Sequence, residues 1–164
     1  MKKIVKWLFY ILLFVLFFAI FMPKRYLYYA FEHEIKKHDV IISDERIEEG
    51  ALSLLLQEGT IYIKGAEAAK FEKTAIYPDI LVNLIQIEKM RFQLLPEVEI
   101  EKILVAYTPL YPVKAFIKGQ SSFGPVEGAI DLKSRRGFID ILSTRPIPFM
   151  KSIEKGRYRY EFGY

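Results

Sequence analysis

An uncharged apolar run near the N-terminus constrains this chain more than any other feature. From Trp7 to Met22 there is no charged residue, and Ile4 and Val5 extend the apolar character past Lys6. Crossing a bilayer takes roughly 20 apolar residues at about 1.5 Å each. The run therefore predicts an N-terminal transmembrane helix.

Two other fates of this run are weighed against a membrane anchor. A cleaved secretory signal has a shorter apolar region of about 7 to 15 residues and then small side chains at the cleavage site. Here Ala19 is followed by the bulky Ile20, Phe21 and Met22. We predict an anchor that is not cleaved, with a cleaved signal and a buried helix of a soluble core as alternatives.

The flanks of the run favour one orientation. Basic residues on the two sides are nearly balanced, but a short basic N-terminus followed by a long tail is typical of an uncleaved anchor. The prediction is a single-pass inner-membrane protein whose C-terminal domain is periplasmic. Aromatic residues near the two ends are expected at the membrane interface, namely Trp7, Tyr26, Tyr28 and Tyr29.

The segment after Pro23 has a helical pattern. Leu27, Phe31 and Ile35 recur every four residues and so share one helix face. We divide the chain into a membrane anchor with an amphipathic extension, residues 1–38, and a second domain, residues 39–164. His33 and His38 are five residues apart, which turns them away from each other on a helix, so no metal site is predicted.

From Val40 onward the apolar residues recur every second residue, which is typical of strands. Gly and Pro separate short runs of this kind, and no strand–helix–strand alternation is visible. The fold class predicted is mainly β: a curled antiparallel sheet with one apolar face, and one or two short helices near Tyr77 to Leu84 and Pro148 to Ile153. The apolar face is expected to contain Leu52, Leu54, Leu56, Ile61, Ile63, Ile85, Ile87, Val126, Ile130, Leu132, Tyr158, Tyr160 and Phe162.

The order of these elements resembles a known family. A single anchor, "LYYAFEHEIKKHDV", the run "ALSLLLQEGTIYIKG" and the later "SSFGPVEGAIDLKSRRGFIDI" are similar to the N protein of type II secretion systems and the wider AsmA-like envelope proteins. The resemblance spans nearly the whole chain and rests on pattern more than on invariant motifs. It implies a periplasmic, non-enzymatic role and brings no catalytic residues or cofactors.

The residues themselves also give no sign of catalysis. Ser121 and Ser122 lack the Gly-x-Ser-x-Gly context of a nucleophile, and the chain has no cysteine. We predict that the protein is not an enzyme and needs no cofactor.

Charge does not predict a nucleic-acid partner. The net charge is +4, but basic and acidic residues are interleaved. Arg157 and Arg159 alternate with tyrosines on opposite strand faces, which does not suit base stacking. The densest basic group, Lys133, Arg135 and Arg136, is interpreted as a solvated hairpin tip, with contact to anionic headgroups as the alternative.

Two functions remain open at this point. In the first, the apolar sheet face of an anchored envelope component holds membrane lipid or a partner strand. In the second, an anchored scaffold docks a secretion or envelope complex by its sheet edge and carries no cargo.

Overall fold

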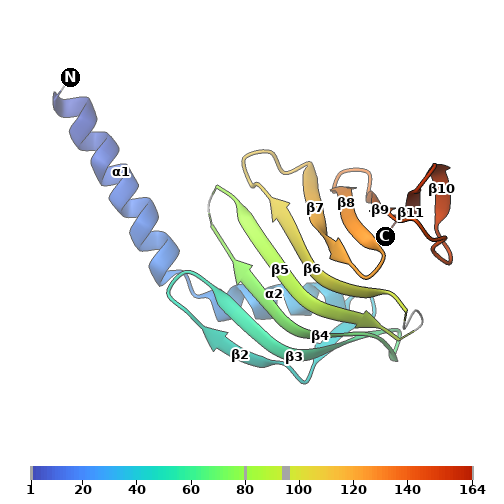
Figure 1. Ribbon diagram of the computed structural model, residues 1–164. Helices are drawn as coiled ribbons and strands as arrows, with labels where there is room; N and C mark the ends of the chain where they lie inside the picture. Colours follow the sequence, from blue (N-terminus) through green and yellow to red (C-terminus); the bar gives the residue numbers. More distant parts are fainter. Residues whose placement is uncertain (1, 80, 94–96, 164) are drawn as a thin grey trace.

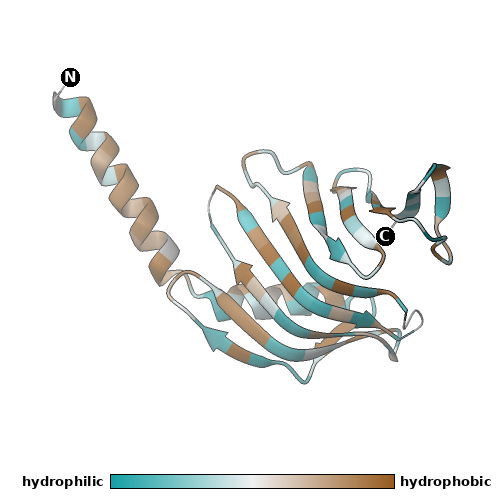
Figure 2. Ribbon diagram, in the orientation of Figure 1, coloured by the Kyte–Doolittle hydropathy of each residue, from teal (hydrophilic) through white to brown (hydrophobic). Residues whose placement is uncertain are grey.

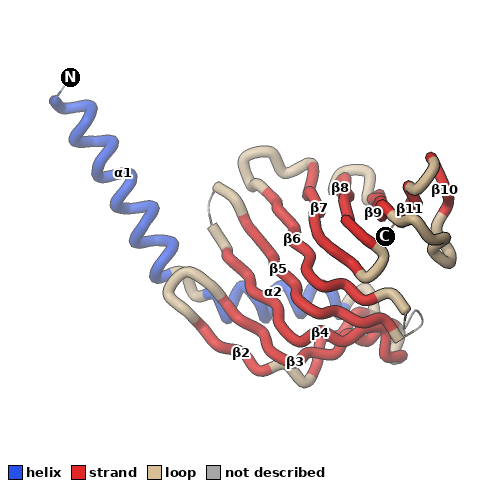
Figure 3. Tube along the Cα trace, viewed as in Figure 1, coloured by secondary structure: helices blue, strands red, loops and turns tan. Residues whose placement is uncertain are grey.

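A computed structural model describes residues 2–79, 81–93 and 97–163 and shows a mainly β protein with two helices at its N-terminus (Figure 1). Helix α1 covers Lys2–Phe21, and helix α2 covers Lys24–Lys36. Pro23 separates them, since proline has no N–H to donate and restricts the residue before it. Every later element is a strand (Figure 3).

The strands form one antiparallel sheet. Its order is β1-β3-β4-β5-β6-β7-β8-β9-β11-β10. Strand β2 also pairs with β3, along the same edge as β1. Each strand from β3 to β8 thus pairs with the strand that follows it. The bounds are β1 Val40–Ser43, β2 Arg46–Glu49, β3 Leu54–Ile63, β4 Ala66–Tyr77, β5 Asn83–Phe92, β6 Glu99–Tyr107, β7 Lys114–Ser121, β8 Gly124–Asp131, β9 Arg136–Leu142, β10 Lys151–Glu154 and β11 Arg157–Gly163.

The expected transmembrane helix is not found. Within the part of the chain that the structure describes, neither helix is both long and apolar enough for a membrane crossing. The uncharged stretch of α1 runs only from Trp7 to Phe21. At 1.5 Å per residue that stretch is about 22 Å long, whereas the hydrocarbon core of a bilayer is about 30 Å thick.

The expected curl of the sheet is also wrong. The sheet is open, with β1 and β2 at one edge and β10 at the other. A curled sheet would hide its apolar face against itself. Here α2 lies against one end of that face and the chain between β9 and β10 packs against the other, so the face is covered without closure (Figure 1).

The two short helices predicted within the sheet domain are wrong as well. Tyr77 ends β4 and Asn83 begins β5, and the described residues between them form a loop. In that loop the Asp79 N–H donates to Asn83 Oδ1 at 3.0 Å and competes with a helical turn. Pro148 precedes a turn, and Lys151–Glu154 is strand β10 because it pairs with β11.

In neighbouring strands of the sheet, the alternation of inward and outward side chains shifts by one residue at matching positions. In β5 the change lies at Lys89, between Ile87 and Met90, where φ is 52°. Glu58 in β3 has the same left-handed backbone, with φ 56°. Apolar side chains on either side of these positions are three residues apart instead of two, yet they still reach the same face.

The core lies on that one face, in two clusters. Tyr28 of α2 packs with Leu54, Leu56 and Phe71 in the first. The second contains Ile100, Val126, Ile141 and Ile147, the last from the chain between β9 and β10. Met90 packs against both clusters, which joins them into one apolar layer.

Candidate functional site

The candidate site is the apolar face of the sheet, and one cross-strand row shows how it is built. Strand register puts eight residues side by side across eight strands. We call this set the apolar row: Leu54, Ile76, Ile85, Val105, Ile117, Gly128, Ile139 and Tyr160. Because side chains alternate between faces along a strand, all members of the row point to the same side. Figure 2 shows the alternation of apolar and polar residues along the strands.

Coverage of this row is uneven. Leu54 is buried under α2, and Tyr160 at the other end is 50 % exposed. Ile85 and Val105 are partly exposed and lie outside both core clusters as described. Ile130, one row further along β8, is also partly exposed. In the middle of the face, partly exposed apolar side chains thus lie beside the buried Ala115 and Ile117, and neither α2 nor the chain before β10 packs over the exposed ones.

The structure places most of the predicted face residues on this side of the sheet. Leu54, Leu56 and Val126 are buried there. The partly exposed members are Ile61, Ile85, Ile87, Ile130, Tyr158 and Phe162. Ile63 is exposed at the end of β3, and Leu132 lies in the loop after β8.

Leu52 and Tyr28 lie elsewhere than the sequence analysis placed them. Leu52 precedes β3, in the loop after β2, and is exposed. Tyr28 is only 3 % exposed and packs into the sheet core, whereas its neighbours Tyr26 and Tyr29 are exposed. The helical repeat explains the difference, since Lys24, Tyr28 and Ile35 share the inward side of α2.

Two glycines shape the apolar face. Phe71 lies across Gly59, where a Cβ would come within 2.1 Å of its ring. At the C-terminal end, Phe162 lies over Gly137 in the same way, at 2.6 Å from a Cβ. In each pair, the glycine has no side chain to fill the space and the aromatic ring of the neighbouring strand occupies it. These rings lie flat on the sheet and keep the face smooth.

The opposite face carries the charges. Lys118, Glu127, Asp140 and Arg159 are neighbours in one cross-strand row of β7, β8, β9 and β11. Opposite charges in such rows attract, while Glu127 and Asp140 alone would repel each other. The charges of this half therefore gather on the side opposite the apolar row, together with some apolar side chains such as Phe116 and Phe138.

Asp140 is the buried centre of that charged row. Its side chain is 2 % exposed, and Arg159 donates to both carboxylate oxygens, at 2.7 Å from Nε and 2.8 Å from Nη2. Arg157 Nε donates to Oδ2 at 3.0 Å. The hydrogen bonds from Arg159, above all, hold the pKa of Asp140 below its usual range. This arrangement fastens β11 to β9, and all its partners are satisfied, so it is a structural ion cluster and not an exposed reactive group.

Tyr28 is the second perturbed group. Its hydroxyl donates to Glu45 Oε1 at 2.8 Å. Burial raises the pKa of Tyr28, and the hydrogen bond to the Glu45 carboxylate raises it further. The bond ties α2 to the β1–β2 connection, which is a structural task.

The junction between α1 and the sheet is also well connected. The backbone N–H of Lys24 donates to Glu49 Oε1 at 3.2 Å, and Arg25 Nη2 donates to the Ile47 carbonyl at 3.1 Å. Lys24 Nζ donates to the carbonyls of Ile20 and Met22 at 3.1 and 3.3 Å. A cation at the C-terminus of a helix is favoured by the helix dipole. The start of α2 is thus bonded to β2, and the Lys24 side chain links it to the C-terminal end of α1.

Groups that could support catalysis or metal binding are not assembled in the described parts of the chain. No three His, Cys, Asp or Glu residues within ranges 2–79, 81–93 and 97–163 are placed to hold a metal ion. The Ser121 hydroxyl is buried and donates to the Gly124 carbonyl at 2.9 Å, closing a turn. Lys133, Arg135 and Arg136 lie at the β8–β9 connection and are exposed.

Comparison with known proteins adds no relative to this picture. No protein-family model matches the chain, and no curated protein and no solved structure is significantly similar to it. The resemblance to the N protein of type II secretion systems and to AsmA-like proteins therefore stays a prediction from the sequence pattern.

Proposed function

We propose that this protein is a non-enzymatic, membrane-anchored envelope component whose apolar sheet face holds lipid acyl chains. The observation that carries the proposal is the partial exposure of Ile85, Val105 and Ile130 in the middle of the apolar face. An apolar surface of this kind gains free energy when it is removed from water, at about 25 cal/mol per Å². Exposed apolar patches on proteins commonly mark the sites where lipids or partners bind.

Helix α1 supports the membrane part of the proposal. Most of its apolar side chains are exposed, among them Trp7, Phe14 and Phe21 at 70, 67 and 73 %. Apolar side chains exposed to this extent need another apolar surrounding, and a bilayer supplies one. Figure 2 shows that α1 is apolar over most of its length.

The proposed location of the sheet is the periplasmic side of the inner membrane. This location rests on the short basic N-terminus and the resemblance described above. An alkaline phosphatase fused after Tyr164 should be active, because that enzyme works only outside the cytoplasm. An inactive but stable fusion would contradict the location.

Native mass spectrometry of the full chain, extracted in a mild detergent, tests the lipid site. We expect phospholipid to remain bound to the extracted protein. The variant Ile85→Gln should lose most of this lipid, because it puts a polar amide in the middle of the apolar face. The variant Leu84→Gln is a matched control, since Leu84 is the preceding residue of β5, is also partly exposed and points to the opposite face.

The outcomes separate the two functions considered. Lipid lost in Ile85→Gln and kept in Leu84→Gln supports lipid binding at the apolar face. Protein that carries no lipid but copurifies with another polypeptide in fixed ratio would contradict it and support the scaffold function. Equal lipid content in both variants would also contradict the site.

A further inference from the structure

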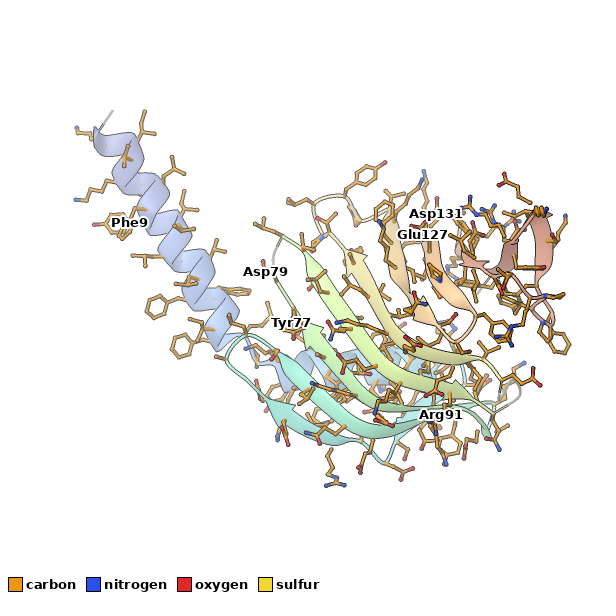
Figure 4. All side chains as sticks on the ribbon, in the orientation of Figure 1. Phe9, Tyr77, Asp79, Arg91, Glu127 and Asp131 are labelled. Carbon is orange, nitrogen blue, oxygen red and sulfur yellow. The ribbon has the colours of Figure 1, made fainter. Side chains whose placement is uncertain are left out.

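The topology gathers four loops at one end of the sheet. Because consecutive antiparallel strands are joined directly, alternate connections lie at opposite ends. The loops between β2 and β3, β4 and β5, β6 and β7, and β8 and β9 therefore share one end, which we call the loop edge: residues 50–53, 78–79 with 81–82, 108–113 and 132–135. Figure 4 shows Tyr77, Asp79 and Asp131 toward this end and Arg91 at the opposite one.

Helix α1 leaves the sheet from the same end. Lys24, the first residue of α2, is bonded to the Ile20 carbonyl of α1 and to Glu49 of β2, and Glu49 is the last residue before the first loop of the loop edge. Figure 1 shows α1 projecting away from the sheet on the side where these loops lie. Any surface that holds α1 is therefore close to the loop edge.

The loop edge exposes large apolar side chains. Leu52, Leu81, Leu110 and Tyr111 are 54, 53, 73 and 63 % exposed, and they come from three different loops. By contrast, the tight β3–β4 turn at the other end carries Lys64 and Gly65 at its tip. Apolar and tyrosine side chains at loop tips suit the interface of a membrane, where an apolar body meets a polar layer.

These loops are held in place by hydrogen bonds between them. The Thr108 hydroxyl donates to the Leu81 carbonyl at 2.7 Å, which links the β6–β7 and β4–β5 loops. The Leu132 N–H donates to the Val113 carbonyl at 2.8 Å, which links β8–β9 to β6–β7. The apolar tips are thus presented by a connected structure, and their exposure does not come from loose packing.

Cations lie beside the apolar tips. Lys114, Lys133, Arg135 and Arg136 are exposed at the end where β7, β8 and β9 meet the loop edge. The nearby Asp131 is engaged by its own turn, where the N–H groups of Ser134 and Lys133 donate to Oδ1 at 2.7 and 3.0 Å. Each basic residue close to an anionic membrane contributes about 1 kcal/mol of attraction.

We infer that the loop edge docks on the surface of the anionic bilayer that holds α1, with Leu81, Leu110 and Tyr111 among the headgroups. The inference rests on the proposed membrane anchoring and adds a second contact to it. With α1 and the loop edge both on the bilayer, the strands stand with one end at the membrane and the apolar face rises from the bilayer surface. Acyl chains could then pass from the bilayer to the apolar face without crossing water.

Site-directed spin labelling of the full chain tests the inference. The chain has no cysteine, so single sites can be labelled. A nitroxide at Ser134→Cys reports on the loop edge, and one at Lys64→Cys reports on the opposite end. In vesicles of phosphatidylcholine with phosphatidylglycerol, a nickel chelate attached to lipid headgroups should relax the Ser134→Cys label at least fivefold more than the Lys64→Cys label.

Two sets of variants identify the contacts. In the Ser134→Cys background, Leu110→Ser with Tyr111→Ser should reduce the relaxation at least twofold. Ile41→Ser with Ile63→Ser is the matched control, because these exposed residues belong to β1 and to the far end of β3, and it should change nothing. Lys133→Gln with Arg136→Gln should reduce the relaxation in anionic vesicles, whereas Lys64→Gln with Lys151→Gln should not.

Flotation of the same samples with the vesicles separates the two proposals. A chain that does not float contradicts membrane anchoring itself, and the loop edge inference fails with it. A chain that floats, but whose two labels are relaxed equally, overturns the loop edge inference alone. Equal relaxation of the Ser134→Cys label in neutral and anionic vesicles would contradict the claim that the loop edge requires anionic lipid.

Discussion

The two halves of the sheet are stabilised in different ways. In the first half, β1 to β5, a helix from outside the sheet packs on the apolar face and places Tyr28 against Leu54 and Leu56. In the second half, β6 to β11, the cover is the short chain before β10, and the buried ion cluster around Asp140 fastens β11 on the other face. The first half depends on apolar burial under a helix, and the second depends more on charge pairing between strands.

This difference explains where the apolar face is uncovered. A helix of 13 residues covers the first strands, but no comparable element lies over the middle of the sheet in the described chain. The last strands need less apolar burial because the ion pairs of Asp140 with its two arginines stabilise them on the charged face. The site proposed for lipid lies between the strands that α2 covers and the strands that the ion cluster fastens.

The largest effect is expected in the helix-covered half. Leu56→Ala should lower the free energy of unfolding by about 3 kcal/mol or more, because it removes a fully buried side chain and leaves a cavity. Urea unfolding of the full chain in detergent, followed by circular dichroism, measures the change. Leu55→Ala is the control, since Leu55 points to the other face and is partly exposed, and an equal loss there would contradict the assignment of the faces.

The second effect concerns the ion cluster. Asp140→Ala should cost about 2 to 3 kcal/mol, because two arginines lose the carboxylate that they share. Glu127→Ala, its exposed neighbour on the same face, should cost less than about 0.5 kcal/mol. If the two variants unfold at the same urea concentration, the second half does not depend on the cluster.

Removal of one hydroxyl tests how α2 is attached. Tyr28→Phe should cost about 1.5 kcal/mol, the value for a hydrogen bond to a charged group, because Glu45 loses its donor. Tyr29→Phe should leave the unfolding curve unchanged, since Tyr29 is exposed. A stable Tyr28→Phe variant would show that apolar contacts alone attach the helix.

Tyr160 tests the uncovered end of the apolar row. Because this side chain is half exposed, Tyr160→Ala should cost about 1 kcal/mol, well below the 3 kcal/mol or more of a fully buried aromatic. Its ring stacks on Phe162 with centroids 6.3 Å apart, which accounts for part of that cost. A loss as large as that of Leu56→Ala would mean that β11 belongs to a closed core.

The smallest effect is a dependence on pH. The pKa of Asp140 is lower in the folded state than the usual value of about 3.9, so the stability that it contributes is fully present above that pH and is lost as pH falls toward the folded pKa. Between pH 5 and 3 the wild type should therefore lose more stability than Asp140→Asn. Parallel curves of unfolding free energy against pH for the two proteins would contradict the lowered pKa of Asp140.

The alternation of apolar residues predicted most of the strands correctly because each strand buries one face only. The same rule predicted that Tyr158 and Arg159 point to opposite sides, and they do.

Other features had no local signal. Tyr28 looks like its neighbours in sequence, and only the position of α2 against β3 decides that it is buried. The role of Asp140 depends on strand β11, 17 and 19 residues further along the chain, whose arginines reach it. The short helices fail because Asp79 bonds to Asn83 across a loop and Lys151–Glu154 pairs with β11, and the curl fails because α2 covers part of the apolar face; neither contact is visible in the local sequence.

The pairing of each strand with the next has a consequence for how the chain folds during synthesis. From β3 to β8 each strand pairs with the next one along the chain, so the loops that must close are short and the sheet can grow by one strand at a time. Each newly added strand is a temporary free edge until the next one leaves the ribosome. Two places differ: β1 pairs with β3, and β11 lies between β9 and β10, so that edge of the sheet is complete only when the seven-residue strand β11 has been made.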